Sequence, residues 1–321
     1  EAEFYNDYLS DLLLHGLREN YGKEVIDYPG SWHLYDDEVQ KIQINQNKLW
    51  GKGFTLNNSL NAFNSFDRAD ISNKIQNNFF DLVIYGSIRR SDLFLDLVID
   101  KKIKHVYVDG EDDTFIDTKF SNQSLYFKRE LNKKTNSALP ISFAIPKSKI
   151  AENINQNPRD LLAPLIPGKL DTYIYEKEND YYEMYFNSLF ALTYKKAGWD
   201  CLRHYEILAN GCIPLFLDLN NCPHETLKSL PKENLLSILN QNEFILSYYN
   251  PFKLFKKKFL TFSKIIKGIN SLYKNKNVDV FLKDNKDINI LRQELLEYTK
   301  SELTTSKLAK YVIENTNNYF K

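Results

Sequence analysis

The 321-residue sequence has no excess of either charge, because 42 lysines and arginines are matched by 42 aspartates and glutamates. A balanced charge gives no electrostatic reason to expect a nucleic acid as a partner. No apolar run reaches the roughly 18 residues that would predict a membrane-spanning helix. The three cysteines cannot all pair, and their spacing is not that of a zinc site. These absences favour a cytoplasmic protein with reduced thiols.

Familiar catalytic motifs are missing as well. No G-x-G-x-x-G follows a predicted strand, so a dinucleotide-dependent oxidoreductase is not indicated. No G-x-S-x-G elbow is present, which removes the usual signature of an α/β-hydrolase. The chain is nevertheless 43% hydrophobic and 14% aromatic, so it can bury a substantial core. Its length fits two domains.

Apolar periodicity predicts strands that alternate with helices. The predicted helices cover 5–22, 91–101, 181–188 and 200–210, and the chain is expected to be helical from about 225 to its end. The predicted strands cover 24–28, 80–86, 104–109, 125–128, 141–145, 171–175, 189–193 and 213–217. Such alternation indicates parallel crossovers and an α/β fold with Rossmann-like sheets.

Five prolines gather between about 140 and 168, where the strand and helix pattern is interrupted and then restarts. We therefore expect two Rossmann-like domains that face each other across a cleft, with residues 1–148 in the first and 149–321 in the second. The strand and glycine-rich turn that usually open such a domain are not recognisable before the helix at 5–22.

The most informative segment is 194–219, which places a polar loop, an amphipathic helix and a buried strand in close succession. Asp200 stands where the N-cap of the helix is expected. Gly211 follows the helix, as expected for a residue that adopts a left-handed conformation. A helix N-terminus with Arg203 and His204 in its first turn is suited to holding a diphosphate.

This segment resembles the donor-binding half of GT-B glycosyltransferases, nearest to the exostosin-like and CgeB-like groups. Those families place a polar loop after a short strand, then a helix with a basic residue and a glutamate, then a Gly-Cys-Ile-Pro strand. The matching positions are Tyr182–Phe190, Gly198, Asp200, Arg203, Glu206, Gly211, Cys212, Ile213 and Pro214. His204 and Tyr205 stand where the exostosin-like group usually has other residues.

The resemblance implies sugar transfer from a nucleotide-sugar donor to a hydroxyl of a glycan or lipid-linked glycan, with no metal and no other cofactor. It implies that Glu206 accepts the ribose hydroxyls, since a carboxylate can accept from two vicinal hydroxyls. Arg203 would neutralise the diphosphate, whose charge grows as the nucleotide leaves. The resemblance also implies that a terminal helix crosses back to the first domain. The implied donor-binding residues are Lys195, Gly198, Trp199, Asp200, Arg203, His204 and Glu206. Alternatively, Arg203 and Glu206 simply pair with each other on the helix surface.

Further candidates follow strands of the first predicted domain, where ligands of α/β sheets usually bind. Asp109, Glu111 and Asp112 are candidate catalytic bases for the acceptor hydroxyl, or else belong to an ordinary acidic turn. Lys128 and Arg129 are candidates for contact with a phosphate or an acceptor anion, or else form surface salt bridges. His15 is a further candidate base, although a lone helix histidine is more often structural.

Residues 253–276 contain eight lysines and no acid, and their aromatic and aliphatic residues recur at helical spacing. A helix of this kind either lies on an anionic membrane surface or packs on its own domain with solvated lysines.

Two functions outside catalysis stay open. One is a non-catalytic module that binds a nucleotide or glycan, and the other is an adaptor at a membrane surface.

Overall fold

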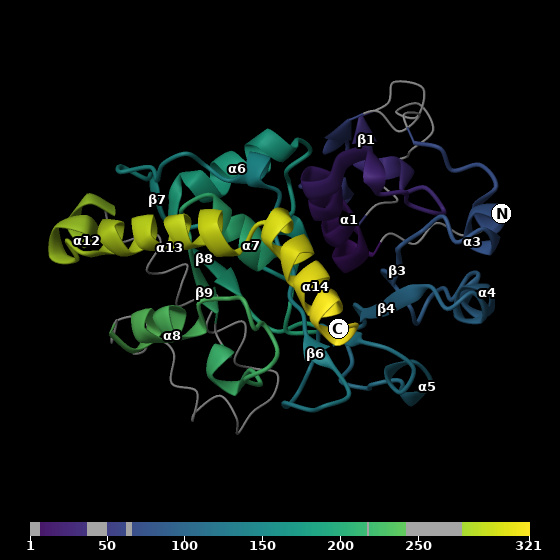
Figure 1. The fold of residues 1–321 in the computed structure, drawn as a ribbon. Coiled ribbons are helices and arrows are strands. Elements are labelled where there is room, and N and C mark those ends of the chain that lie inside the picture. Colours follow the sequence, from purple (N-terminus) through teal and green to yellow (C-terminus); the bar gives the residue numbers. More distant parts are fainter. Residues whose placement is uncertain (1–6, 37–49, 62–65, 217, 242–277) are drawn as a thin grey trace.

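The computed structural model describes residues 7–36, 50–61, 66–216, 218–241 and 278–321. Its strands and helices form an α/β fold with parallel sheets (Figure 1). The α/β class expected from the sequence is therefore confirmed. The lysine-rich segment 253–276 lies outside the described residues.

A four-stranded parallel sheet occupies the first half of the chain, in the order β3-β4-β5-β6. Its strands are β3 (Leu82–Tyr85), β4 (Lys104–Asp109), β5 (Tyr126–Lys128) and β6 (Leu139–Pro140). Short helices accompany it, namely α3 (Ile71–Gln76), α4 (Leu95–Asp100) and α5 (Thr118–Ser121). Residues 106–109 of β4 and all of β5 are buried, and apart from Asp109 and Lys128 these residues are aliphatic or aromatic.

A three-stranded parallel sheet follows, in the order β7-β8-β9. Its strands are β7 (Asp160–Leu162), β8 (Ser188–Thr193) and β9 (Ile213–Phe216), and its helices are α6 (Glu178–Phe186) and α7 (Leu202–Ala209). The sheets share one continuous apolar core, to which Val106 and Phe127 contribute from the first sheet and Phe190 and Ile213 from the second. The packing is therefore continuous from one sheet to the other.

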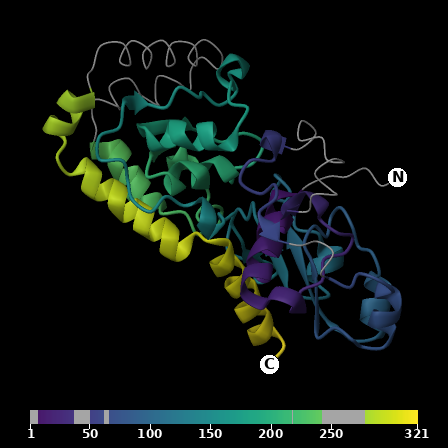
Figure 2. The same cartoon turned by 90° about the horizontal axis from the view of Figure 1, so that it is seen from above.

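The last helices run along one side of the molecule, from the second sheet back to the beginning of the chain (Figure 2). After α8 (Lys232–Gln241) come α12 (Val278–Asp284), α13 (Ile288–Glu302) and α14 (Thr305–Tyr319). α13 packs on α7, while α14 packs along α1 (Tyr8–Tyr21) (Figure 1). The expected return of a terminal helix to the start of the chain is confirmed.

Three predicted strands are wrong. Residues 24–28 begin at the end of a 3-10 turn and include Asp27, whose carboxylate accepts hydrogen bonds from Arg18 and from the backbone of Ser31. Residues 171–175 begin in a 3-10 turn held by the Thr172 side chain, which binds the backbone of Ile166 and Lys169. Within the described residues, 141–145 contribute only a single bridge, from Ile145 to Thr304. A small parallel pair, β1 (Tyr35–Asp36) with β2 (Leu60–Asn61), was not predicted.

The strand order of the four-stranded and three-stranded sheets follows the chain order, so neither contains the reversal at which doubly wound folds bind ligands. Among the described residues, no helix has the length and apolar character needed to cross a membrane.

The α1–α14 contact gives a direct test of the packing. A Cβ on Gly16 would overlap the backbone carbonyl of Thr305, although a Gly to Ala change inside a helix ordinarily stabilises it by about 1 kcal/mol. We predict that Gly16→Ala instead lowers the free energy of unfolding by about 1–3 kcal/mol, as measured by urea denaturation. Asn317→Ala, at an exposed position of α14, is the control and should not destabilise the protein. A Gly16→Ala variant as stable as the wild type would contradict the close approach.

Candidate functional site

Helix α7 begins at Leu202, two residues after the predicted start at residue 200. Its N-cap is Cys201, whose side chain caps no backbone N–H, and Asp200 lies before it. The Asp200 carboxylate caps no backbone N–H of the helix and instead accepts the backbone N–H of Phe143 at 2.8 Å. The expected N-cap role of Asp200 is therefore wrong. Burial raises the pKa of Asp200 to about 7, against the opposing influence of Arg129.

The loop before α7 is fixed by two residues that follow β5. Glu130 accepts the backbone N–H groups of Trp199 and Asp200 at 3.0 and 2.9 Å. Arg129 donates to the carbonyl of Asp200 at 2.6 Å, and its guanidinium also contacts Asp112. The carboxyl end of β5 thus meets the loop that leaves the carboxyl end of β8.

Gly198 is required by this contact. A Cβ at position 198 would lie 2.7 Å from a carboxylate oxygen of Asp112 and 2.7 Å from one of Glu130. Trp199 is buried against Phe216, with ring centroids 6.2 Å apart. The exposed Lys195 stands over the Trp199 ring at 5.2 Å. The predicted donor residues 198–200 therefore serve to join the two sheets.

His204 points into the core. Its ring lies 4.5 Å from that of Phe216, and its nitrogens contact the Thr193 hydroxyl and the Trp199 carbonyl. Burial lowers the pKa of His204 to about 4, so the ring is neutral at physiological pH. The expected help of His204 in holding a diphosphate is not supported, because a neutral, fully buried imidazole brings no charge to a ligand.

Glu206 lies on a different side of α7 and is also buried. One carboxylate oxygen accepts the Thr55 hydroxyl at 2.5 Å, and the other accepts the Tyr181 hydroxyl at 2.6 Å. Burial raises the pKa of the Glu206 carboxyl, and these two hydroxyl donors partly oppose the rise. The carboxylate therefore holds two hydroxyl groups inside the protein, where an unpartnered charge would be costly.

Arg203 is one helical turn from Glu206, but its described hydrogen bond goes to the Tyr173 hydroxyl, at 3.2 Å. The Nε of Arg203 has no hydrogen-bond partner among the described residues. The simple surface pair of Arg203 with Glu206 is thus not what the structure contains. The Tyr173 hydroxyl also accepts a hydrogen bond from the backbone N–H of Gly168. Burial opposes ionisation of Tyr173, but Arg203, the N–H of Gly168 and Lys196 together outweigh it, so the pKa of the phenol is lowered.

Sequence reasoning missed the hydroxyl groups around this pair. They come from three segments, and they are Tyr8, Thr55, Tyr173, Tyr181, Tyr182 and Tyr185. Tyr8 lies near enough to Glu206 and Arg203 for their charges to act on its phenol. The one available signal was the density of tyrosine in 173–185, which holds five of them. Nothing in the sequence pointed to Thr55.

The predicted acidic cluster is not a single site. Asp109 is fully buried, accepts hydrogen bonds from Lys128 at 2.9 Å and from Tyr126 at 2.6 Å, and so forms an internal ion pair. Neither Asp109 nor Lys128 is exposed to an acceptor or a phosphate, and the predicted ligand contacts of both are not supported. Glu111 and Asp112 keep side chains 30% and 54% exposed, paired with Arg90 and Arg129.

His15 lies between α1 and α14, where its Nδ1 is 3.0 Å from the Thr305 hydroxyl. The side chain is buried, and burial lowers its pKa. This position explains His15 as part of a helix contact, and a role as the base of an acceptor site is not supported. Among the described residues, no group of three or more ligand-type side chains is placed to hold a metal ion.

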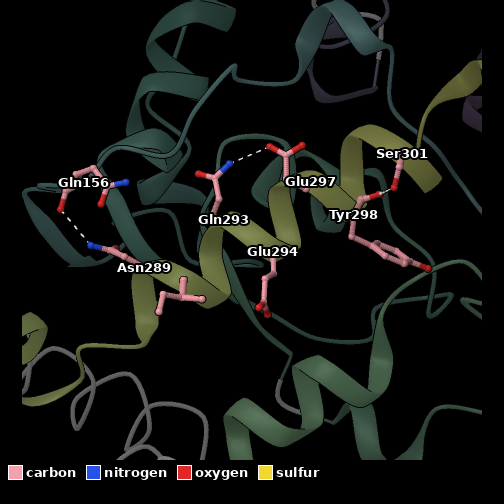
Figure 3. Close-up of a pocket in the computed structure, with 8 residues that line it drawn as sticks. Gln156, Asn289, Gln293, Glu294, Glu297, Tyr298 and Ser301 are labelled. Atoms are coloured by element: carbon pink, nitrogen blue, oxygen red, sulfur yellow. Dashed lines mark hydrogen bonds between the residues drawn. The ribbon is translucent and has the colours of Figure 1, made fainter.

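A groove of about 810 Å³ lies on the outer side of α13 (Figure 3). Its lining comes mainly from α13 and consists of Gln156, Asn289, Ile290, Gln293, Glu294, Glu297, Tyr298 and Ser301. It contains none of the predicted site residues, and its two glutamates would repel a diphosphate. The groove is therefore not a donor site.

Comparisons with protein-family models, with curated proteins and with solved structures returned no match to this chain. The interpretation of the site accordingly depends on the geometry around Arg203 and Glu206.

The buried imidazole predicts a pH effect on stability. The pKa of His204 is about 4 in the folded protein against an ordinary value of 6.5, so this residue contributes stability above pH 6.5 that is lost as the pH falls toward 4. By linkage the loss at pH 5 is about 2 kcal/mol. We predict that His204→Gln loses about 2 kcal/mol less than the wild type between pH 7.5 and pH 5, measured by urea unfolding. Parallel pH profiles for the two proteins would contradict the burial of a neutral histidine.

Proposed function

We propose that this protein is a GT-B type glycosyltransferase that moves a sugar from a nucleotide-sugar donor to a hydroxyl acceptor. The observation that carries the proposal is the Glu206 carboxylate, which accepts two hydroxyl hydrogen bonds one helical turn from an arginine with no described carboxylate partner. A ribose diol beside a diphosphate presents the same chemistry, with hydroxyls for a carboxylate and negative charge for a guanidinium.

The arrangement around α7 also supports the proposal. In α/β sheets, ligands bind outside the carboxyl ends of strands. The carboxyl end of β8 leads into α7, and the residues after β5 meet it there. We take residues 1–148 and 149–321 as two Rossmann-like domains in this proposal, with the acceptor on the first and the donor on the second.

Within this proposal, Arg203 stabilises the departing diphosphate by direct charge, and electrostatic stabilisation of this kind usually contributes most to catalysis. Tyr173 holds the guanidinium in place until the diphosphate binds. Glu206 orients the ribose, and so positions the sugar for attack. Of the predicted catalytic acids, Glu111 and Asp112 keep exposed carboxylates, and they retain the proposed role of base toward the acceptor.

Binding provides the first test. We predict that a nucleoside diphosphate or nucleotide-sugar raises the melting temperature of the wild type in a panel of bases and sugars. Arg203→Gln and Glu206→Gln should each weaken that binding by about tenfold or more, since hydrogen bonds to charged groups contribute about 1.5–3 kcal/mol. The matched controls are Arg159→Gln and Glu183→Gln, which make the same changes in an exposed ion pair of 3.7 Å.

Turnover distinguishes the two classes of function. Release of nucleoside diphosphate from the donor, absent in Arg203→Gln and Glu206→Gln, would support a transferase. Tight binding without any release would favour the non-catalytic binding module. A panel in which no nucleotide changes the melting temperature would defeat both. Loss of binding in the Arg159 and Glu183 controls would show that the effect does not arise at α7.

A further inference from the structure

Thr55 occupies the hydroxyl position on Glu206 from a distant part of the chain. Its side chain is buried and donates to Glu206 at 2.5 Å, while its backbone N–H donates to Glu178 at 2.6 Å. The Tyr182 hydroxyl completes the contact, at 2.5 Å from the Thr55 hydroxyl. Residues 51–58 around Thr55 are here named the Thr55 loop. Among the described residues, Thr55 alone makes the polar contacts of this loop with α6, through Glu178 and Tyr182, and with α7, through Glu206.

The Thr55 loop is held in a conformation that its residues disfavour. Lys52, Thr55 and Asn58 have positive φ angles of 58°, 79° and 54°. A positive φ is a genuine outlier for a β-branched residue such as threonine. Strained backbone of this kind persists only where surrounding contacts over-determine it, and it clusters at ligand-binding and switch regions. The contacts with Glu206 and Glu178 supply that constraint.

A second attachment lies earlier in the Thr55 loop. Lys52 forms an ion pair with Glu176 at 2.7 Å and donates to the carbonyl of Tyr175 at 3.1 Å. Both partners are in the segment that leads into α6. Ionic or charge-assisted contacts thus hold the loop near α6 and α7 at one exposed and one buried position, and Phe54 packs against Tyr181 between them.

The group that Thr55 presents to Glu206 is a secondary alcohol, as are the ring hydroxyls of a sugar. We propose that the Thr55 loop is an internal occupant of the hydroxyl subsite on Glu206, which a sugar hydroxyl of the ligand must displace. This inference rests on the proposed function, since it takes Glu206 as the group that receives the ribose. Only the fraction of molecules with the loop released then binds ligand, and the apparent affinity is reduced by that fraction.

Removing the hydroxyl tests the competition. UDP, GDP, ADP and CDP are titrated against the wild type, Thr55→Val and Thr55→Ser by isothermal calorimetry. Thr55→Val keeps the shape of the side chain without its hydroxyl, and it should bind the preferred nucleotide about tenfold more tightly than the wild type. Thr55→Ser retains a hydroxyl for Glu206 and should stay within about threefold of the wild type.

A second pair of variants guards against a misfolded Thr55→Val. Lys52→Ala removes the exposed attachment and leaves Thr55 intact, and it should raise nucleotide affinity by about two- to fivefold. Lys74→Ala is the matched control, because its ion pair with Asp67, also 2.7 Å, is made away from the Thr55 loop. It should leave the affinity unchanged.

Hydrogen–deuterium exchange supplies a measurement without nucleotide. Peptides that cover 50–61 should exchange at least fivefold faster in Thr55→Val than in the wild type or Thr55→Ser. In the wild type, adding the nucleotide should speed exchange in these peptides while slowing it in α7, as displacement requires.

The outcomes separate the two proposals. Equal nucleotide affinity in the wild type, Thr55→Val and Lys52→Ala would overturn the internal occupant and leave the donor function standing. Unchanged exchange at 50–61 in Thr55→Val would overturn it as well. If no variant binds any nucleotide, both the donor function and the displacement by a sugar hydroxyl fail.

Discussion

The position of α7 depends on one buried carboxylate, that of Glu130. It accepts two successive backbone N–H groups, from Trp199 and Asp200, and so fixes the loop from which the helix starts. Arg129 balances the charge of this buried carboxylate from 3.0 Å. Arg129 also donates to the carbonyl of Asp200, so Arg129 and Glu130 together bind both the backbone N–H groups and a backbone carbonyl of the loop. Loss of Arg129 would leave the Glu130 carboxylate uncompensated in the interior.

Helical geometry then assigns separate tasks to neighbouring residues of α7. Successive side chains on a helix are rotated by about 100°, so Arg203 and His204 cannot face the same ligand while both remain in the first turn. His204 enters the apolar core, where burial keeps it neutral. Arg203 and Glu206, three residues apart, lie on neighbouring parts of the surface and meet the tyrosines of 173–185. One side of α7 thus packs on the sheet through His204, and another side contributes Arg203 and Glu206 to a polar cluster.

Local patterns in the sequence predicted β8, α7 and β9 well, because their apolar periodicity is decided by neighbouring residues and tertiary contacts reinforce it. The same patterns could not separate a site from a structural ion pair. Asp109 was predicted to be a candidate base or part of an acidic turn, yet it ends β4 and is buried with Lys128, a pairing between strands that composition does not reveal. The contact of Thr55 with Glu206 joins residues 151 positions apart, and no local rule specifies it. The sequence therefore predicted Arg203 and Glu206 of the proposed site, but the contact with Thr55 depends on the fold of the whole chain.

In the proposed displacement, the environment of Glu206 limits which ligands can take the place of Thr55. A buried carboxylate that gives up the Thr55 hydroxyl must receive another donor, because an unsatisfied charged group in the interior costs more than the bond it lost. An apolar ligand, or one with only acceptors, cannot replace Thr55 without that penalty. Tyr181 stays hydrogen-bonded to Oε2 of Glu206, so the incoming ligand must place its hydroxyl at Oε1, where Thr55 was bound. Discrimination of this kind is strong where the wrong ligand leaves a polar site unpaired, so the proposed site would favour a hydroxyl-bearing ligand over a close analogue that lacks the group.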